Sequence, residues 1–183
     1  MRVMPKRKPI ALGFEVDELT NSIVNTVTGD SLPTEVSLVT KEDLARIKRD
    51  KTWLFDWSKE HKKANAQVYK LTIERNPQII QGLACFEAMQ DHVFMHLIES
   101  ANFNRGAQKM YKGVMGNLVA FGCKLSFEKG FEGCLSFIAK TALVQHYIDA
   151  LGAFLFGART MIIEVKAALQ LIQKYYPDEY KSR

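Results

Sequence analysis

The sequence predicts an α+β fold, in which a central sheet is flanked by helices, and three observations support this prediction. The chain has 183 residues, of which 47% are hydrophobic, so it can bury the core of one domain. Three strand-like runs follow one another between residues 66 and 99. From residue 111 onward, runs with helical spacing of apolar residues alternate with short strand-like runs. We expect a basic flexible tail at residues 1–11 and a single domain at residues 12–183.

The first 60 residues carry the weakest pattern. Residues 35–39 are predicted as a first strand, and Thr40 is a residue type that caps a following helix. Trp53, Phe55 and Trp57 then cluster. These aromatic side chains either contact a substrate or anchor a loop to the core, and we expect the second role because such side chains are mostly buried.

A hairpin and a third strand are predicted in the middle of the chain. Alternating residues indicate a strand at 66–74, turn-forming residues follow at 75–78, and residues 79–87 are its hairpin partner. Residues 92–99 are long enough for a central strand.

The most informative stretch is residues 111–118, where a polar loop carrying Arg105 and Lys109 turns into an amphipathic helix that opens with Gly113 and Gly116. The first N–H groups of a helix have no helical acceptor, and the peptide dipoles add positive potential there. A pyrophosphate can therefore bind such a helix start through the main chain. The alternative is that the glycines serve packing or turn geometry.

A strand and a second helix follow this helix. The first helix ends at Gly130, and residues 134–139 form a short strand-like run. Thr141 is predicted to cap the second helix, which ends at Gly152.

The end of the chain completes the pattern. Residues 153–164 are predicted as one strand, bent near Gly157. Residues 165–176 are predicted as a closing amphipathic helix that Pro177 terminates, because proline cannot continue a helix.

This order of elements resembles the GNAT superfamily of N-acetyltransferases over residues 65–176. The family's motif before its long helix is Gln or Arg, two free positions, Gly, one free position, and Gly or Ala. Here that motif falls on residues 111–116. Gly116 fits the last position, whereas Tyr111 and Val114 differ from the usual residues.

A second motif of the family is a tyrosine shortly before a Gly-aromatic pair. Tyr147 and Gly152 resemble it, with one additional residue between them and with Ala153 in place of the aromatic residue. The resemblance implies a mostly antiparallel mixed sheet whose middle strands splay apart, with the amide-bearing arm of CoA between them.

The resemblance also implies the function of an N-acetyltransferase with acetyl-CoA as cosubstrate. A primary amine of a small molecule or protein would attack the acetyl group directly in a ternary complex. The implied cofactor-binding residues are Leu97, Ile98, Glu99, Tyr111, Lys112, Gly113, Val114, Met115, Gly116, Asn117, Leu118 and Ser136.

Each catalytic task has a candidate residue. Tyr147 would protonate the departing thiolate, as the family tyrosine does, and a backbone N–H near Ile98 or Glu99 would stabilise the oxyanion. The general base is predicted to be Glu99, with Glu87 and His96 as alternatives.

Composition excludes several other classes. No apolar run approaches the roughly 20 residues that cross a bilayer, and the start of the chain lacks the apolar core of a secretion signal, so we expect a cytoplasmic protein without a membrane partner. Cys85, Cys123 and Cys134 lack the spacing of a disulfide framework or a zinc site, and no metal is expected.

The net charge of +5 leaves two alternatives open. One is a CoA-binding module of the same fold without catalysis. The other is a basic interaction protein, supported by the cations at residues 2–8. The cations at residues 41–63 alternate with acids, as on a solvated helical face, so nucleic acid is not favoured as a partner. The acceptor amine and a homodimeric assembly are not determined by the sequence.

Overall fold

A seven-stranded sheet organises the protein, which we describe from a computed structural model covering residues 8–181. Most of the predicted basic tail, at residues 1–7, lies outside this range. The order across the sheet is β3 (Thr34–Leu38), β4 (Ala66–Ile73), β5 (Asn76–Ala88), β6 (Val93–Ser100), β8 (Leu135–Ile138), β10 (Thr160–Ile163) and β9 (Phe154–Phe156). All neighbouring strands are antiparallel except β6 and β8. The predicted mixed, mostly antiparallel sheet is confirmed.

A smaller sheet lies beside the start of the long helix. Its order is β2 (Ser31–Leu32), β1 (Ile23–Asn25) and β7 (Tyr111–Lys112).

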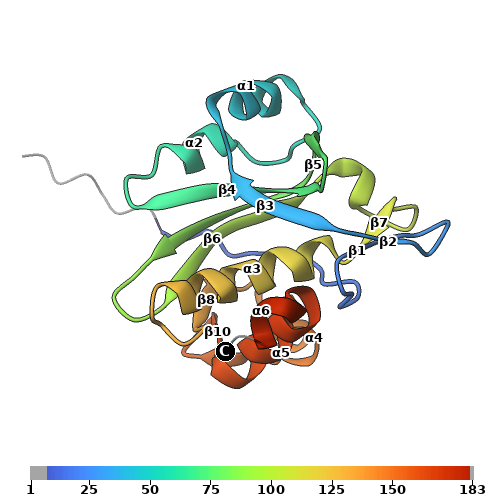
Figure 1. Cartoon of the computed structure of the whole chain (residues 1–183). Coiled ribbons are helices and arrows are strands. Elements are labelled where there is room, and N and C mark those ends of the chain that lie inside the picture. Colours follow the sequence, from blue (N-terminus) through green and yellow to red (C-terminus); the bar gives the residue numbers. More distant parts are fainter. Residues whose placement is uncertain (1–7, 182–183) are drawn as a thin grey trace, which may run out of the picture.

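Helices cover both faces of the large sheet (Figure 1). Helix α3 packs against β5, β6 and α5, whereas α2 packs against β4 and α1. The helices are α1 (Lys41–Arg49), α2 (Trp57–His61), α3 (Val114–Glu128), α4 (Val144–Leu151), α5 (Val165–Tyr175) and α6 (Pro177–Lys181). Short 3₁₀ turns precede β7 and α4, at Asn102–Asn104 and Thr141–Leu143.

The two middle strands separate soon after they meet. The parallel pairing of β6 with β8 is confined to Val93 opposite Leu135 and Phe94 opposite Ser136. The next part of β6 is bulged, because the register against β5 shifts by one residue at His96. Beyond the bulge β6 keeps β5 on one edge, and no strand of residues 8–181 pairs with the other. The predicted splay of the middle strands is therefore confirmed.

Several predicted boundaries change. Residues 153–164 form a hairpin of β9 and β10, because Gly157 adopts a positive φ of 71° and reverses the chain rather than bending it. Strand β5 begins at Asn76, because a tight turn at Arg75 with φ 63° closes the hairpin. Pro177 ends α5 but also begins α6, since proline is compatible with the first turn of a helix.

The predicted helix caps have different outcomes. Thr40 caps α1 in a reciprocal capping box with Asp43, as predicted. Thr141 makes no side-chain cap, because a 3₁₀ turn begins there and α4 starts only at Val144. Among the clustered aromatic residues, Trp57 is almost fully buried, as an anchor should be, whereas Phe55 is 40% exposed.

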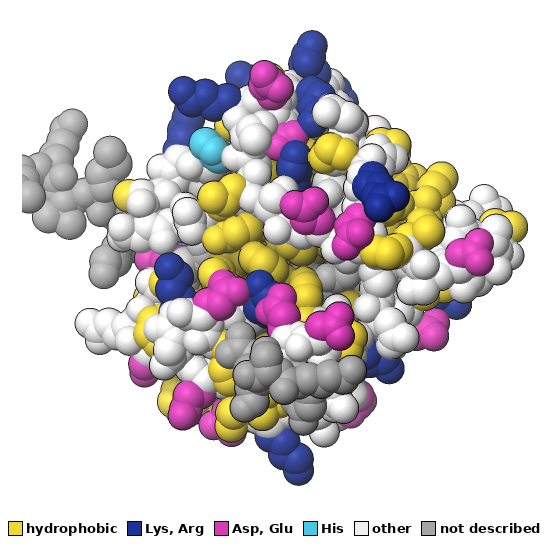
Figure 2. Space-filling model, in the orientation of Figure 1, with side chains coloured by type: hydrophobic (Ala, Val, Ile, Leu, Met, Phe, Trp, Pro, Cys, Tyr) yellow, Lys and Arg dark blue, Asp and Glu magenta, His cyan; other side chains and the backbone are white. Residues whose placement is uncertain are grey.

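Charged side chains gather over the end of the molecule that carries α1 and α2 (Figure 2). Three of them pair with an acid in or next to the same helix, namely Arg46–Asp43, Lys59–Asp56 and Lys63–Glu60. The Lys59–Asp56 pair is exposed, as on a solvated helical face, whereas Asp43 and Glu60 are buried beneath their cations.

Candidate functional site

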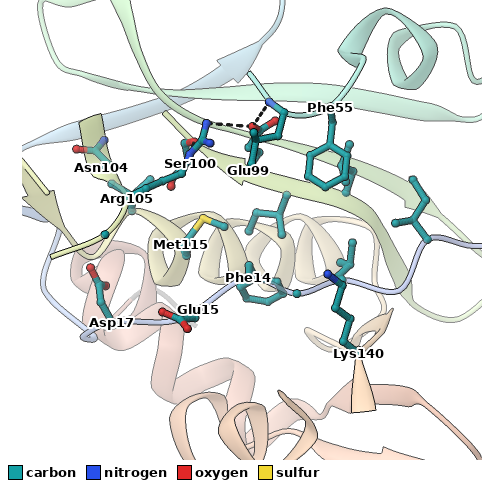
Figure 3. Close-up of a pocket in the computed structure, with 18 of the residues that line it drawn as sticks. Phe14, Glu15, Asp17, Phe55, Glu99, Ser100, Asn104, Arg105, Met115 and Lys140 are labelled. Carbon is teal, nitrogen blue, oxygen red and sulfur yellow. Dashed lines mark hydrogen bonds and ion pairs between the residues drawn. The ribbon is translucent and has the colours of Figure 1, made fainter. Parts of the chain in front are cut away.

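A cavity of about 530 Å³ opens where β6 and β8 diverge (Figure 3). Its upper wall comes from the end of β6 and from the loop before α2, and the first residues of α3 contribute to its floor. The apolar side chains that line it are Ile10, Leu12, Phe14, Leu54, Phe55, Leu97, Ile98, Val114 and Met115. Polar groups line its two ends, with Asn104, Arg105, Asp17 and Lys109 at one end and Lys140 near the other.

Residues 10–17, which we term the N-terminal strap, form the remaining wall of the cavity. The Leu12 N–H donates to the Ile138 carbonyl at 2.7 Å, and the Lys140 N–H donates to the Leu12 carbonyl at 2.8 Å. These bonds make Leu12 a parallel partner of Ala139 on the edge of β8 that faces β6. Leu12, Phe14 and Val16 are buried, whereas the residues between them are exposed. The strap therefore behaves as a short additional strand in the splay.

Tyr147 lies under the strap and not in the cavity wall. Its side chain is fully buried, and its hydroxyl donates to the Phe14 carbonyl at 2.7 Å. The rings of Phe14 and Tyr147 stack, with centroids 4.7 Å apart. Burial raises the pKa of Tyr147 above its ordinary value. On the same helix, His146 Nε2 accepts from the Val16 N–H at 2.9 Å, so α4 holds the strap at two points.

Glu99 is a buried carboxylate in the opposite wall. It accepts from the Leu54 N–H at 2.6 Å, from Trp57 Nε1 at 2.7 Å and from Arg105 Nη2 at 3.1 Å. A carboxylate with three donors and a cationic partner is well satisfied despite its burial. Glu99 thus fixes the loop that carries Phe55 against β6.

The alternative bases Glu87 and His96 form a separate pair. His96 Nε2 lies 2.6 Å from Glu87 Oε2, and both side chains are partly exposed. The imidazole packs edge-on against Phe94. Neither residue lines the cavity, although His96 occupies the bulge at which the splay begins.

The start of α3 is covered by the protein's own chain. Gly113 has φ 85°, and its N–H donates to Asp17 Oδ1 at 3.1 Å. A Cβ at Gly113 would collide with the Thr20 hydroxyl, and one at Gly116 would collide with the Tyr175 hydroxyl. The glycines therefore allow a close approach of other segments of this chain, which is the packing alternative raised by their sequence pattern.

Asp17 also forms an ion pair with Lys109, at 3.0 Å. The Asp17 carboxylate thus accepts a hydrogen bond at the helix start and pairs with a neighbouring cation. Both groups attract anions.

The other predicted cofactor residues are dispersed. Leu97, Ile98, Val114 and Met115 line the cavity beside Glu99. Tyr111 and Lys112 form β7 and pair with β1, and Ser136 lies opposite Phe94, where the splay is still closed. The remaining two residues are buried in α3: Asn117, which bonds Thr34 and Tyr176, and Leu118.

Sequence reasoning did not identify the strap or Lys140 as parts of the site. The alternation of Leu12, Phe14 and Val16 with other residues is a pattern typical of a strand. The partner of Leu12, Ala139, lies more than 120 residues away in the chain. Lys140 lies over Gly13, and no pattern near Lys140 indicated that contact.

The described part of the chain contains no cluster of side chains suited to hold a metal ion. None of its helices combines the length and hydropathy needed to span a bilayer.

Comparison with known proteins identifies the fold. No protein-family model matches the chain, and no curated protein matches it in sequence. A structure of AtaTR bound with acetyl-CoA matches with a TM-score of 0.54 and 14% identity, over 76% of this chain and 98% of that chain. A Desulfovibrio desulfuricans protein described as an acetyltransferase of the GNAT family matches with a TM-score of 0.53 and 12% identity, over 72% and 99%.

A spermidine N-acetyltransferase, SpeG, built as a chimera of the Vibrio cholerae and hSSAT sequences, matches with a TM-score of 0.51 and 14% identity. The match covers 74% of this chain and 98% of that chain. With its splayed mixed sheet and these structural matches, the chain has the fold of the GNAT acetyltransferases.

Proposed function

We propose that the protein is an acetyl-CoA-dependent N-acetyltransferase that acetylates a primary amine of a small molecule or protein. The observation that carries this proposal is the edge of β6 beside the cavity, which over Leu97, Ile98 and Glu99 pairs with no second strand in the described part of the chain. Free N–H and C=O groups on such an edge can pair with the amide groups of a pantetheine arm, as an added strand would. The apolar side chains that β6 and α3 contribute to the lining suit the methylene groups of that arm.

Binding of the nucleotide end is assigned to the end of the cavity that carries Arg105 and Lys109. Both cations line the cavity, and Val114 and Met115 bring the first turn of α3 to the same place. Positive side chains and the helix start would together attract the phosphates. In the proposal Gly113 and Gly116 support this turn from within the fold.

The amine attacks the thioester carbonyl in a ternary complex, and a β6 backbone N–H near Ile98 stabilises the oxyanion. Glu99 is proposed as the base because it lies in the cavity wall, and His96 and its partner Glu87 are the alternatives because His96 lies in the bulge at which the splay begins. Leu54 and Arg105 donate to Glu99 Oε1, and Trp57 donates to Oε2, so Oε2 is the oxygen proposed to take the proton. Tyr147 is proposed as the acid that protonates the thiolate.

A CoA-binding module without catalysis is the second candidate. Two observations favour it: Tyr147 is fully buried beneath the strap, and Asp17 holds the Gly113 N–H. Release of free CoA with a panel of amines separates the two candidates, since only the enzyme consumes the thioester.

Filling the cavity tests the location of the site. Met115→Trp should weaken acetyl-CoA binding at least tenfold in calorimetry, because the indole would occupy the space beside β6. Met89→Trp is the matched control, since Met89 is exposed in the turn between β5 and β6 and does not line the cavity. Equal affinity of the two variants, both folded by circular dichroism, would place the site elsewhere.

A further inference from the structure

We infer that the N-terminal strap is a built-in competitor of the acyl-CoA ligand and must leave the splay before that ligand is fully bound. The inference rests on the proposed function and adds a mode of regulation to the same site. It is drawn from what the strap contacts, because the strap holds three groups that would otherwise be available to a ligand in the splay.

The first group is the edge of β8. In the open splay this edge would face the ligand arm, yet the Ile138 carbonyl and the Lys140 N–H are both paired with Leu12. The strap thus takes the position of an added strand on β8 and leaves only the β6 edge free.

The second group is the Tyr147 hydroxyl. It donates to the Phe14 carbonyl, and the Phe14 ring stacks on the phenol and separates it from the cavity. While the strap is seated, this hydroxyl cannot reach a sulfur atom in the cavity.

The third group is the anion-attracting corner at the start of α3. Asp17 accepts from the Gly113 N–H and pairs with Lys109. A carboxylate of the strap therefore satisfies a helix N–H and a cation that a ligand phosphate would otherwise use.

These contacts define two states. In the first state the strap is bound to β8, only the β6 edge faces the cavity, and the Tyr147 hydroxyl is bonded to Phe14. With the strap released, both edges, the Tyr147 hydroxyl and Lys109 become available together. A ligand that binds only the released state lowers its own apparent affinity by the fraction of molecules in that state.

A reversible covalent lock tests the inference in the full-length chain. Gly13 and Lys140 lie side by side, since a Cβ at Gly13 would come within 2.7 Å of the Lys140 Cδ. The double variant Gly13→Cys, Lys140→Cys removes that Lys140 atom and allows a disulfide to close the strap onto β8. The single variant Gly13→Cys, oxidised in parallel, controls for reactions of Cys85, Cys123 and Cys134.

The readout is calorimetric affinity for acetyl-CoA, measured with the same double variant before and after reduction. We expect binding to be at least tenfold weaker in the oxidised form and to recover on reduction. Equal affinity in the two forms would overturn the role of the strap while leaving the proposed function intact. No binding by either form or by the wild type would overturn the proposed function, and this inference with it.

A second pair of variants tests the corner without a disulfide. Asp17→Ala should tighten acetyl-CoA binding several-fold, because it releases the Gly113 N–H and Lys109. Glu15→Ala removes the same charge from the strap but has no such contacts, so its effect should be smaller. Weaker binding by Asp17→Ala than by Glu15→Ala would show that Asp17 supports the site and would contradict the inference.

Discussion

The two strand edges that border the cavity differ in what covers them. Beyond Phe94 the outer edge of β6 pairs with no strand among residues 8–181, although the Ser100 carbonyl accepts from Arg105 Nε, and β5 holds the strand on its other edge. The edge of β8 is covered by the strap through the pairing of Leu12 with Ala139. The splay is therefore asymmetric, because within the described residues one wall has no strand partner and the other is paired with the strap.

This difference indicates how the fold keeps its middle strands apart. An unpaired strand edge in an apolar core is costly unless its polar groups find partners. On β8 the partners come from the strap, whereas on β6 the edge faces a cavity that solvent or a ligand can enter. The asymmetry therefore depends on different residues in the two walls: Glu99 holds the β6 wall, and Phe14 holds the strap against α4. Each can be replaced in turn.

Removing the anchor of the β6 wall should have the largest effect. Glu99→Ala is expected to lower the free energy of unfolding by about 3 kcal/mol, because Leu54 and Trp57 would lose their buried acceptor. Urea denaturation measures this change. Glu87→Ala is the control, since its carboxylate is partly exposed and, among the described residues, bonds only the His96 side chain. An equal loss of unfolding free energy in both variants would show that the bonds of Glu99 do not stabilise the β6 wall more than an exposed carboxylate does.

Removing the anchor of the strap should have a smaller and more local effect. Phe14→Ala is expected to lower the free energy of opening of the strap by about 2–3 kcal/mol, because a buried ring is lost. Hydrogen exchange at the Leu12 amide should accelerate, whereas exchange at the Leu97 amide should change little. Equal acceleration at both amides would mean that strap and sheet unfold as one unit.

The sequence predicted the elements of the β6 wall better than those of the strap, for a physical reason. Strands β4, β5 and β6 and helix α3 have strong local periodicity, and their neighbours follow directly in the chain. The strap pairs with residues near 139, so its role depends on a contact that local pattern does not encode.

The glycines at the start of α3 show the same limit for the site. Their pattern indicates that something approaches the helix closely, and the structure shows Thr20 and Tyr175 in that space. A glycine fixes the available volume but not the identity of the group that fills it. For this reason the main-chain geometry was predictable, whereas the occupation of the corner by Asp17 was not.

The smallest effect concerns the hydroxyl that joins the strap to α4. Burial raises the pKa of Tyr147 above its ordinary value of 10.0, so the folded state favours the neutral phenol. The stabilisation is fully present below pH 10 and is lost as the pH rises from 10 toward the folded pKa. Tyr147→Phe should therefore flatten the alkaline fall in stability by about 1.4 kcal/mol per pH unit, measured by urea denaturation.

The same variant connects the strap to catalysis. If release of the strap frees the Tyr147 hydroxyl to protonate the thiolate, Tyr147→Phe should lower turnover by about 100-fold or more. Loss of the bond to Phe14 should also loosen the strap, so acetyl-CoA binding should not weaken. A flattened alkaline profile with unchanged turnover would assign the hydroxyl to the strap alone and the proton transfer to another group.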